Sequence, residues 1–215
     1  MTSGTVSLAI LDYGMGNLRS VEKALQRVGA STVITSDPST VRSADGIILP
    51  GVGAFPRAMG RIRELGLDEL LLDEAAAGTP ILGICLGYQL IFESSVELGG
   101  AEGLGLLSGP VTEIPSGGRK IPHIGWAATS WEKPSQLTDG LRPGEPFYFV
   151  HSFVPEPAAE EVIGMSEYGG RFASVASRGN TYGVQFHPEK SSHAGLRLLK
   201  NFAGICAREK EGAAS

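Results

Sequence analysis

The segment Gly83-Ile84-Cys85-Leu86-Gly87 constrains the fold of this chain more than any other part of the sequence. It follows a short apolar run and precedes a helix-like stretch, so it predicts a buried strand, a sharp turn and a helix in direct succession. The two glycines allow a turn in which a Cβ would not fit, and such a turn projects the cysteine from the end of a sheet. The helix N-terminus favours the thiolate. The segment therefore predicts a nucleophile elbow, although a cysteine without this setting is usually inert core packing.

The first half of the chain alternates between strand-like and helix-like patterns. In the first predicted helix, apolar residues recur at helical spacing after Asn17, a suitable cap, and Gly29 can end it. This alternation predicts an α/β fold of three layers, with a mostly parallel, flavodoxin-like sheet covered by helices on both faces. Strands are expected at 6–11, 32–35, 46–49 and 81–84, and helices at 18–28, 68–77 and 87–93.

The second half of the chain contains strand-like runs separated by short turns, which predict additional antiparallel strands. A last helix begins near Ser191, and neither a repeat nor a Pro/Ser linker separates the halves. Residues 1–215 are therefore expected to form a single domain whose last few residues are a disordered tail. The additional strands are expected at 110–114, 147–150, 162–168, 171–178 and 182–186.

Composition excludes several classes of protein. A formal net charge of −5 argues against a general nucleic-acid binder, which needs a basic face. Two cysteines cannot form a disulfide framework and fit a reducing compartment. The uncharged stretch 75–92 is interrupted by Pro80 and three glycines, so no membrane span is expected. With no basic region before the first apolar stretch, no secretory signal is expected either, and the prediction is a cytoplasmic protein.

No cofactor or metal is expected. The loop Gly14-Met15-Gly16 resembles the start of a dinucleotide-binding fingerprint, but Arg19 occupies the position of its third glycine. The sequence lacks C-x-x-C and H-x-x-x-H pairs, which are typical of zinc sites. Cys206 lies on the apolar face of the last helix and is expected in the core.

His187-Pro188-Glu189 follows the last predicted strand, at the sheet edge where active sites of open α/β sheets gather. Pro188 restricts the backbone, which could present His187 as a general base and Glu189 as the carboxylate that orients it. A thiol nucleophile needs such a base to take its proton and later give it to the leaving group. The alternative is a surface turn in which Glu189 caps the last helix.

The other candidate positions are less specific. Pro50-Gly51-Val52-Gly53 could turn backbone N–H groups toward a developing oxyanion, together with the amide of Leu86, although an ordinary tight turn fits it equally well. His123 and His151 are expected to make structural hydrogen bonds or to line a pocket, and His193 to be solvated.

Together these motifs resemble the class I, or triad, glutamine amidotransferases over nearly the whole chain, from Asp12 to Ser191. The elbow and His-Pro-Glu are common to all triad glutaminases and identify only the superfamily. Five further segments resemble the branch that serves histidine biosynthesis. These segments are 12–20, 49–55, 122–126, 147–153 and 189–191.

The resemblance implies hydrolysis of glutamine to glutamate and ammonia, with Cys85 as nucleophile, His187 as acid/base and Glu189 as third member. In that branch, ammonia passes to a (β/α)₈-barrel synthase subunit, a heterodimer partner that makes imidazole glycerol phosphate and aminoimidazole carboxamide ribotide. The remaining implied roles are Val52, Gly53 and Leu86 at the oxyanion hole, Gln89, Ser152 and Phe153 in glutamine binding, and Trp126, Tyr148 and Lys190 at the partner interface.

Two positions depart from the family pattern, which commonly has Asn where this chain has Ala127 and Met where it has Tyr88. The first could alter polar contacts at the interface and the second could alter packing of the pocket. Three other readings remain open. The chain could serve another acceptor enzyme, such as an anthranilate or guanylate synthase, it could be a cysteine peptidase or esterase, or it could be a catalytically silent binding module.

Overall fold

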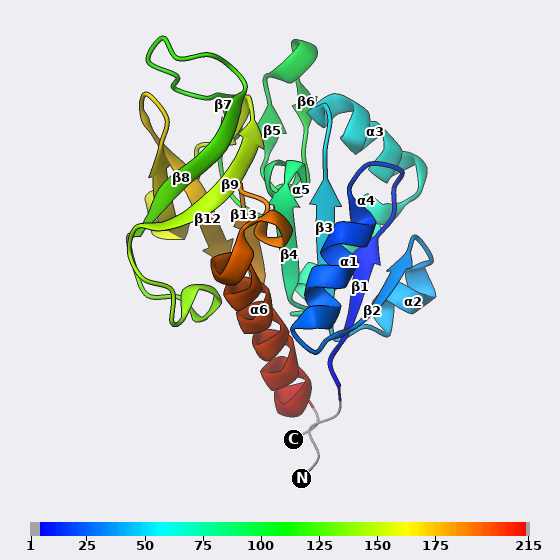
Figure 1. Ribbon diagram of the computed structural model, residues 1–215. Coiled ribbons are helices and arrows are strands. Elements are labelled where there is room, and N and C mark those ends of the chain that lie inside the picture. The colour runs from blue at the N-terminus through cyan, green and yellow to red at the C-terminus, as the bar shows by residue number, and fades with distance from the viewer. Residues whose placement is uncertain (1–4, 214–215) are drawn as a thin grey trace.

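The computed structural model describes residues 5–213 and contains a nine-stranded mixed sheet with helices on both of its faces (Figure 1). The strand order is β2-β1-β3-β4-β13-β12-β11-β8-β9, and a separate four-stranded sheet has the order β10-β7-β5-β6. This arrangement confirms the predicted α/β class with its added antiparallel strands. The strands are β1 Ser7–Leu11, β2 Ser31–Thr35, β3 Gly46–Gly51, β4 Ile81–Cys85, β5 Ser94–Ser95, β6 Ala101–Glu102, β7 Pro110–Glu113, β8 His123–Trp131, β9 Glu145–His151, β10 Phe153–Pro155, β11 Val162–Glu167, β12 Arg171–Arg178 and β13 Thr181–Val184.

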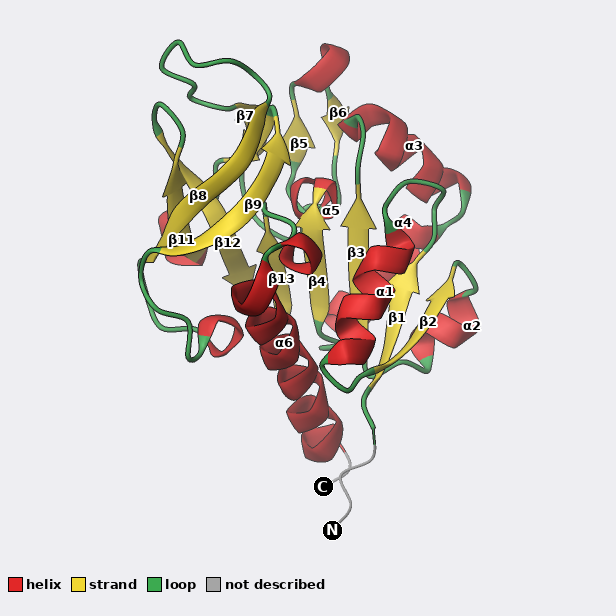
Figure 2. Cartoon of the chain, viewed as in Figure 1, coloured by secondary structure: helices red, strands yellow, loops and turns green. Residues whose placement is uncertain are grey.

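Alternating side chains of the parallel strands pack against different helices. Leu8 and Ile10 of β1 belong to the cluster formed with α1 and α6, whereas Ala9 and Leu11 belong to the cluster formed with α3 and α4. The period of two residues therefore sends successive side chains into opposite layers. Figure 2 shows the helices of these layers in red around the yellow sheet. The helices are α1 Leu18–Arg27, α2 Pro38–Arg42, α3 Phe55–Glu64, α4 Leu67–Ala76, α5 Leu86–Leu90 and α6 Ser192–Ala213, with 3₁₀ turns at Glu97–Gly99, Gln136–Thr138, Ala159–Glu161 and Pro188–Lys190.

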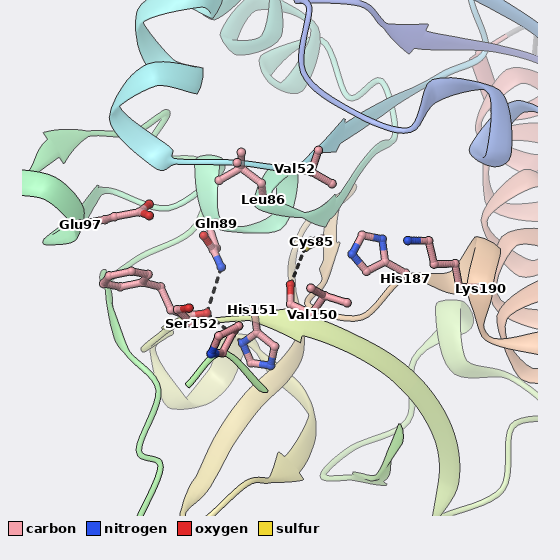
Figure 3. Close-up of a pocket in the computed structure, with 13 residues that line it drawn as sticks. Val52, Cys85, Leu86, Gln89, Glu97, Val150, His151, Ser152, His187 and Lys190 are labelled. Carbon is pink, nitrogen blue, oxygen red and sulfur yellow. Dashed lines mark hydrogen bonds between the residues drawn. The ribbon is translucent and has the colours of Figure 1, made fainter. Parts of the chain in front are cut away.

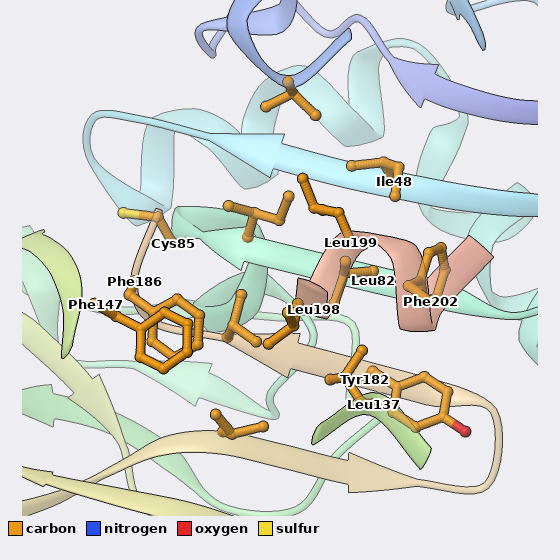
Figure 4. Packing of buried hydrophobic residues seen from close by; sticks show 14 of the residues in the cluster. Ile48, Leu82, Cys85, Leu137, Phe147, Tyr182, Phe186, Leu198, Leu199 and Phe202 are labelled. Carbon is orange, nitrogen blue, oxygen red and sulfur yellow. The ribbon is translucent and has the colours of Figure 1, made fainter. Parts of the chain in front are cut away.

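The core continues from the parallel strands into the antiparallel ones. The ring of Phe147 in β9 stacks on Phe186, which follows β13, with 3.9 Å between ring centroids (Figure 4). Leu198 and Phe202 of α6 are fully buried in the same cluster. Burial of this much contiguous apolar surface couples the two halves of the chain.

Several predicted elements needed correction. The predicted strand 182–186 is Thr181–Val184, and it pairs in parallel with β4 as well as antiparallel with β12. The predicted helix 87–93 ends at Leu90. Asn17 occupies the cap position of α1 but makes no side-chain cap hydrogen bond. Helices α2 and α3 and the whole of strand β8 were not predicted, the strand because alternate β8 residues are exposed and it lacks a continuous apolar run.

Two further observations concern membrane association and the C-terminus. In residues 5–213, no helix is both long enough and apolar enough to cross a bilayer. Of the tail predicted for the last few residues, Ala214 and Ser215 lie outside the described part of the chain, and α6 continues to Ala213.

The sheet order places three loops at one edge. Strand β4 lies between β3 and β13 and is parallel to both, so the carboxyl ends of the three strands adjoin each other. Gly51 at the end of β3 is in register with Cys85 at the end of β4. The loop that follows β13 carries His187. Parallel pairing therefore brings the predicted elbow, glycine loop and His-Pro-Glu segment to one place.

Candidate active site

Cys85 occupies a strained turn between β4 and α5. Its φ of 55° and ψ of −107° are unusual for a residue with a Cβ, and strain of this kind persists only where packing fixes the backbone. A Cβ on Gly87 would lie 1.7 Å from the carbonyl oxygen of Leu49, and one on Gly83 would lie 2.6 Å from that of Gly87. The glycines therefore let α5 pack directly against β3 and β4, and this close packing holds Cys85 at the end of its strand.

The structure brings Cys85, His187 and Glu189 together. His187 Nδ1 lies 2.9 Å from Oε1 of Glu189, whose side chain is 1% exposed. Burial lowers the pKa of His187, but a side-chain hydrogen bond with Cys85, the bond to Glu189 and the charges of both groups outweigh it and raise the pKa to about 10. These contacts favour an imidazolium placed between Cys85 and Glu189, an order of nucleophile, base and orienting group that suits nucleophilic catalysis.

The loop that carries His187 is fixed to β9. The backbone N–H of His187 donates to the carbonyl of Tyr148 over 2.9 Å. Ser191, which is 1% exposed, closes the other side: its hydroxyl donates to the carbonyl of His187 and accepts from the backbone N–H of Tyr148. These bonds satisfy the backbone N–H and the carbonyl of His187, both of which are buried. They therefore fix the position of its imidazole at the edge of the sheet.

A cavity of about 260 Å³ opens beside Cys85 and His187 (Figure 3). A volume this small suits a ligand of amino-acid size. The residues assigned by resemblance to the oxyanion hole and to glutamine binding all line it, although their roles remain predictions. The lining consists of Val52, Gly53, Cys85, Leu86, Gln89, Glu97, Pro122, Val150, His151, Ser152, Phe153, His187 and Lys190.

The glycine loop after β3 forms one wall of this cavity. Tyr13 is 1% exposed, and its hydroxyl donates to the carbonyl of Pro50 over 2.6 Å. Burial, together with the charge of Cys85, raises the pKa of Tyr13, so this hydroxyl keeps its proton. The Tyr13 bond therefore fixes the peptide between Pro50 and Gly51. The Val52 side chain beyond it is 45% exposed, so this segment is open on its outer side.

Three pocket residues were not singled out for the site from the sequence. Glu97 accepts a hydrogen bond from the backbone N–H of Phe55 over 2.7 Å, and no sequence signal marks it, because it lies in a short 3₁₀ turn. The Val150 carbonyl lies 3.6 Å from the Cys85 sulfur. Pro122 is the third of them, whereas His151 lines the pocket, one of the two roles expected for it from the sequence. The apolar run 147–150, which ends next to His151, could have pointed to Val150, since residues at the ends of strands often reach a site.

The residues assigned by resemblance to a partner interface form one cluster at the rim. Trp126 is 54% exposed and contacts the ring of Tyr148 edge to face, with 5.8 Å between centroids. Lys190, which also lines the cavity, lies 5.9 Å from the centre of the Tyr148 ring.

The departures from the family pattern lie on different sides of the sheet. Tyr88 is fully buried against Gly183 and is not among the cavity-lining residues, so any effect on pocket packing would act through the core and stays a prediction. Its side chain faces the core because helix α5 turns that position away from the elbow. Ala127 adjoins Trp126 on β8, near the predicted interface.

Comparison with known proteins agrees with this geometry. The family model for glutamine amidotransferase class-I matches residues 9–205. The imidazole glycerol phosphate synthase subunit HisH of Moorella thermoacetica is 51% identical over 92% of this chain and 94% of its own length. The HisH subunit of Desulfitobacterium hafniense is 49% identical over 91% of this chain and 92% of its own length.

Solved structures share the fold at lower identity. A glutamine amidotransferase superimposes with a TM-score of 0.72 at 21% identity, covering 92% of this chain and 98% of that one. PurLQS from Thermotoga maritima gives 0.73 at 20% identity, covering 94% and 99%. On these matches, and in agreement with the resemblance noted in the sequence, the chain belongs to the class-I glutamine amidotransferase family and, within it, to the HisH subunits of imidazole glycerol phosphate synthase.

Proposed function

We propose that this chain hydrolyses glutamine to glutamate and ammonia as the glutaminase subunit of imidazole glycerol phosphate synthase, in histidine biosynthesis. The observation that carries the proposal is that Cys85 and His187 line one small pocket, with the buried Glu189 bonded to the far nitrogen of His187. High identity to HisH subunits over more than nine-tenths of the chain supports the choice of branch.

The geometry supports a thioester mechanism. The Cys85 thiolate attacks the side-chain carbonyl carbon of glutamine, and backbone N–H groups of Val52, Gly53 and Leu86 stabilise the oxyanion. His187 then protonates the nitrogen, the carbon–nitrogen bond breaks, and ammonia leaves a thioester on the sulfur. With His187 as base, water attacks the thioester, and glutamate departs as the thiol is regenerated. Glu189 holds the imidazole in one tautomer and stabilises its cation throughout.

A subunit of a synthase works with a partner subunit, and we infer that this partner is a (β/α)₈ barrel that consumes the ammonia. The exposed Trp126, with Tyr148 and Lys190 beside it, supports a docking surface next to the pocket. Tryptophan and tyrosine are frequent anchors of protein interfaces. Ammonia would then leave the pocket on the side where the partner binds. We expect both subunits to be cytoplasmic.

Partner binding is also expected to complete the oxyanion hole. If the loop 50–53 starts with its amides turned away from the sulfur, docking can turn them inward and switch hydrolysis on. The lone chain would then be nearly silent.

The decisive assay measures ammonia release from glutamine by the chain alone and with the barrel synthase and its ligand. We expect turnover that rises strongly in the complex. Release as fast without the partner as with it would contradict the coupling. Peptide or ester cleavage without free ammonia would instead support the hydrolase alternative, and activation by an anthranilate or guanylate synthase would reassign the acceptor.

A further inference from the structure

Two histidines outside the predicted triad contact each other behind the substrate pocket. His123 of β8 and His151 of β9 are directly paired across the two strands. The Nδ1 of His123 lies 3.1 Å from the Nε2 of His151, and the residues are 3% and 6% exposed. His151 lines the cavity beside Cys85, whereas His123 lies one layer further from it.

The backbone carbonyl of Phe153 cannot donate a hydrogen bond, and this sets the direction of the bonds that the two histidines make. The Nδ1 of His151 lies 3.0 Å from the carbonyl oxygen of Phe153, which only accepts, so this nitrogen carries a proton. In a neutral imidazole the other nitrogen is then an acceptor. His151 Nε2 therefore accepts from the Nδ1–H of His123, and both rings are protonated on Nδ1.

The surroundings keep both rings neutral. Burial, with the charge of Arg119 nearby, lowers the pKa of His123 to about 4. Burial also lowers the pKa of His151 to about 3, against the opposing effect of the Phe153 carbonyl, and the charges of His123 and His187 lower it further. The ring of Tyr168 stacks on His123 with 4.1 Å between ring centroids.

The same carbonyl sets the orientation of Gln89. The carbonyl of Phe153 also accepts from Nε2 of Gln89 over 2.9 Å (Figure 3). The same nitrogen lies 3.2 Å from Oε1 of the buried Gln185. Because the nitrogen of the Gln89 amide faces two acceptors, the oxygen must be the other terminal atom. No donor among residues 5–213 meets that oxygen, and Gln89 lines the cavity, so the oxygen is available to a donor group of the substrate.

We propose that His123 and His151 are positioning residues for substrate binding: they hold the Phe153 carbonyl in place, and through it turn the Gln89 amide oxygen toward the α-ammonium group of glutamine. The inference rests on the proposed glutaminase function. The substrate end it concerns is the one remote from Cys85, so the pair affects binding in the ground state and the transition state alike.

Two substitutions at His123 separate the hydrogen bond from ring packing. His123→Phe keeps a ring against Tyr168 and Phe149 but removes the donor, whereas His123→Asn removes the ring and keeps an N–H near the position of Nδ1. In the complex with the barrel synthase, we expect His123→Phe to raise the KM for glutamine about three- to tenfold, with kcat within about twofold. The separate variant His123→Asn is expected to keep the KM for glutamine within about twofold of the wild-type value, because it keeps the donor.

Unchanged KM in His123→Phe, or an equal loss in both variants, would overturn the proposal. Nitrogen-15 NMR of histidine-labelled wild-type complex tests the same arrangement without any substitution. It should show both rings neutral and protonated on Nδ1, and a proton on Nε2 of either ring would also overturn it. Failure of the wild-type complex to release ammonia from glutamine would instead reject the proposed function, whatever the tautomers.

Discussion

His187 Nδ1 lies 2.9 Å from Oε1 of Glu189, a residue only two positions further along the chain. The turn at Pro188 lets two residues so close in sequence face each other. The second oxygen of the Glu189 carboxylate has no hydrogen-bond partner within the described residues. A buried carboxylate with a single partner stabilises positive charge on that partner strongly. This pair assigns the Nδ1 proton and leaves the opposite nitrogen of His187 for Cys85.

Replacement of Glu189 by Gln should therefore lower activity with little change in shape. We expect kcat for ammonia release to fall by about 10²- to 10⁴-fold, because the amide neither fixes the tautomer nor stabilises the cation. Steady-state kinetics at saturating glutamine measure the effect. A kcat within about threefold of wild type would show that Glu189 has no part in orienting the base.

The raised pKa of His187 predicts a pH dependence of stability. The group titrates at about 10 when folded, against 6.5 for an unperturbed histidine, so the folded state binds the proton more tightly. The stabilisation is fully present below pH 6.5, declines above it, and is lost as the pH passes about 10. Urea unfolding of wild type and His187→Asn across this range should show the excess stability of wild type shrinking as pH rises. An excess that grows with pH would contradict the charged pair.

The elbow predicts contrasting effects of two glycine substitutions. Gly87→Ala puts a Cβ into the Leu49 backbone and should reduce the free energy of unfolding by about 3 kcal/mol or more. Gly60→Ala, in the middle of α3 with open space around it, should raise it by up to about 1 kcal/mol. Chemical denaturation of both variants checks the contrast. Equal effects at the two positions would mean that the close contact of α5 with β3 is not needed for the fold.

Ser191 should affect both stability and catalysis, although it does not line the pocket. Ser191→Ala leaves the Tyr148 N–H without its acceptor and releases the His187 carbonyl, at a cost of about 1–3 kcal/mol. We also expect a lower kcat, since the histidine loop loses one of its ties to β9. Ser192→Ala, an exposed neighbour, is the matched control in the same unfolding and activity assays. Identical behaviour of the two variants would remove Ser191 from the site's supporting structure.

The sequence predicted the parallel half of the fold well, because its strands are continuous apolar runs and its turns contain glycine. It missed β8, where exposed Ile124 and Trp126 alternate with less exposed positions. The strand predicted at 182–186, which is β13, was also grouped with the antiparallel strands alone. In the structure β13 joins the parallel and antiparallel parts of the sheet, because it pairs in parallel with β4. Register across strands distant in sequence has no local signature, so that junction was not visible in the chain itself.

In the candidate site too, residues with a local sequence signal were predicted, and contacts that depend on strand pairing were not. Cys85, His187 and Glu189 are marked by local backbone chemistry, through the glycines of the elbow and Pro188, so a single sequence sufficed to nominate them. The link from His123 through His151 to Phe153 depends on the pairing of β8 with β9. Glu97 enters the pocket from a turn that no periodic pattern marks. The sequence could therefore suggest structural or pocket-lining roles for the two histidines, but neither their contact nor the place of Glu97, which depend on tertiary pairing.

Covalent capture by Cys85 tests the central claim most directly. The chain, in complex with its synthase partner, is incubated with an electrophilic diazoketone analogue of glutamine, and the modified peptide is identified by mass spectrometry. We expect one label, on Cys85, with loss of ammonia release. Cys85→Ala should remain unlabelled and lose at least about 10³-fold in kcat, while Cys206→Ala, altered at the buried cysteine of α6, should label and turn over like wild type. Labelling of another residue, or substantial turnover by Cys85→Ala, would contradict the account.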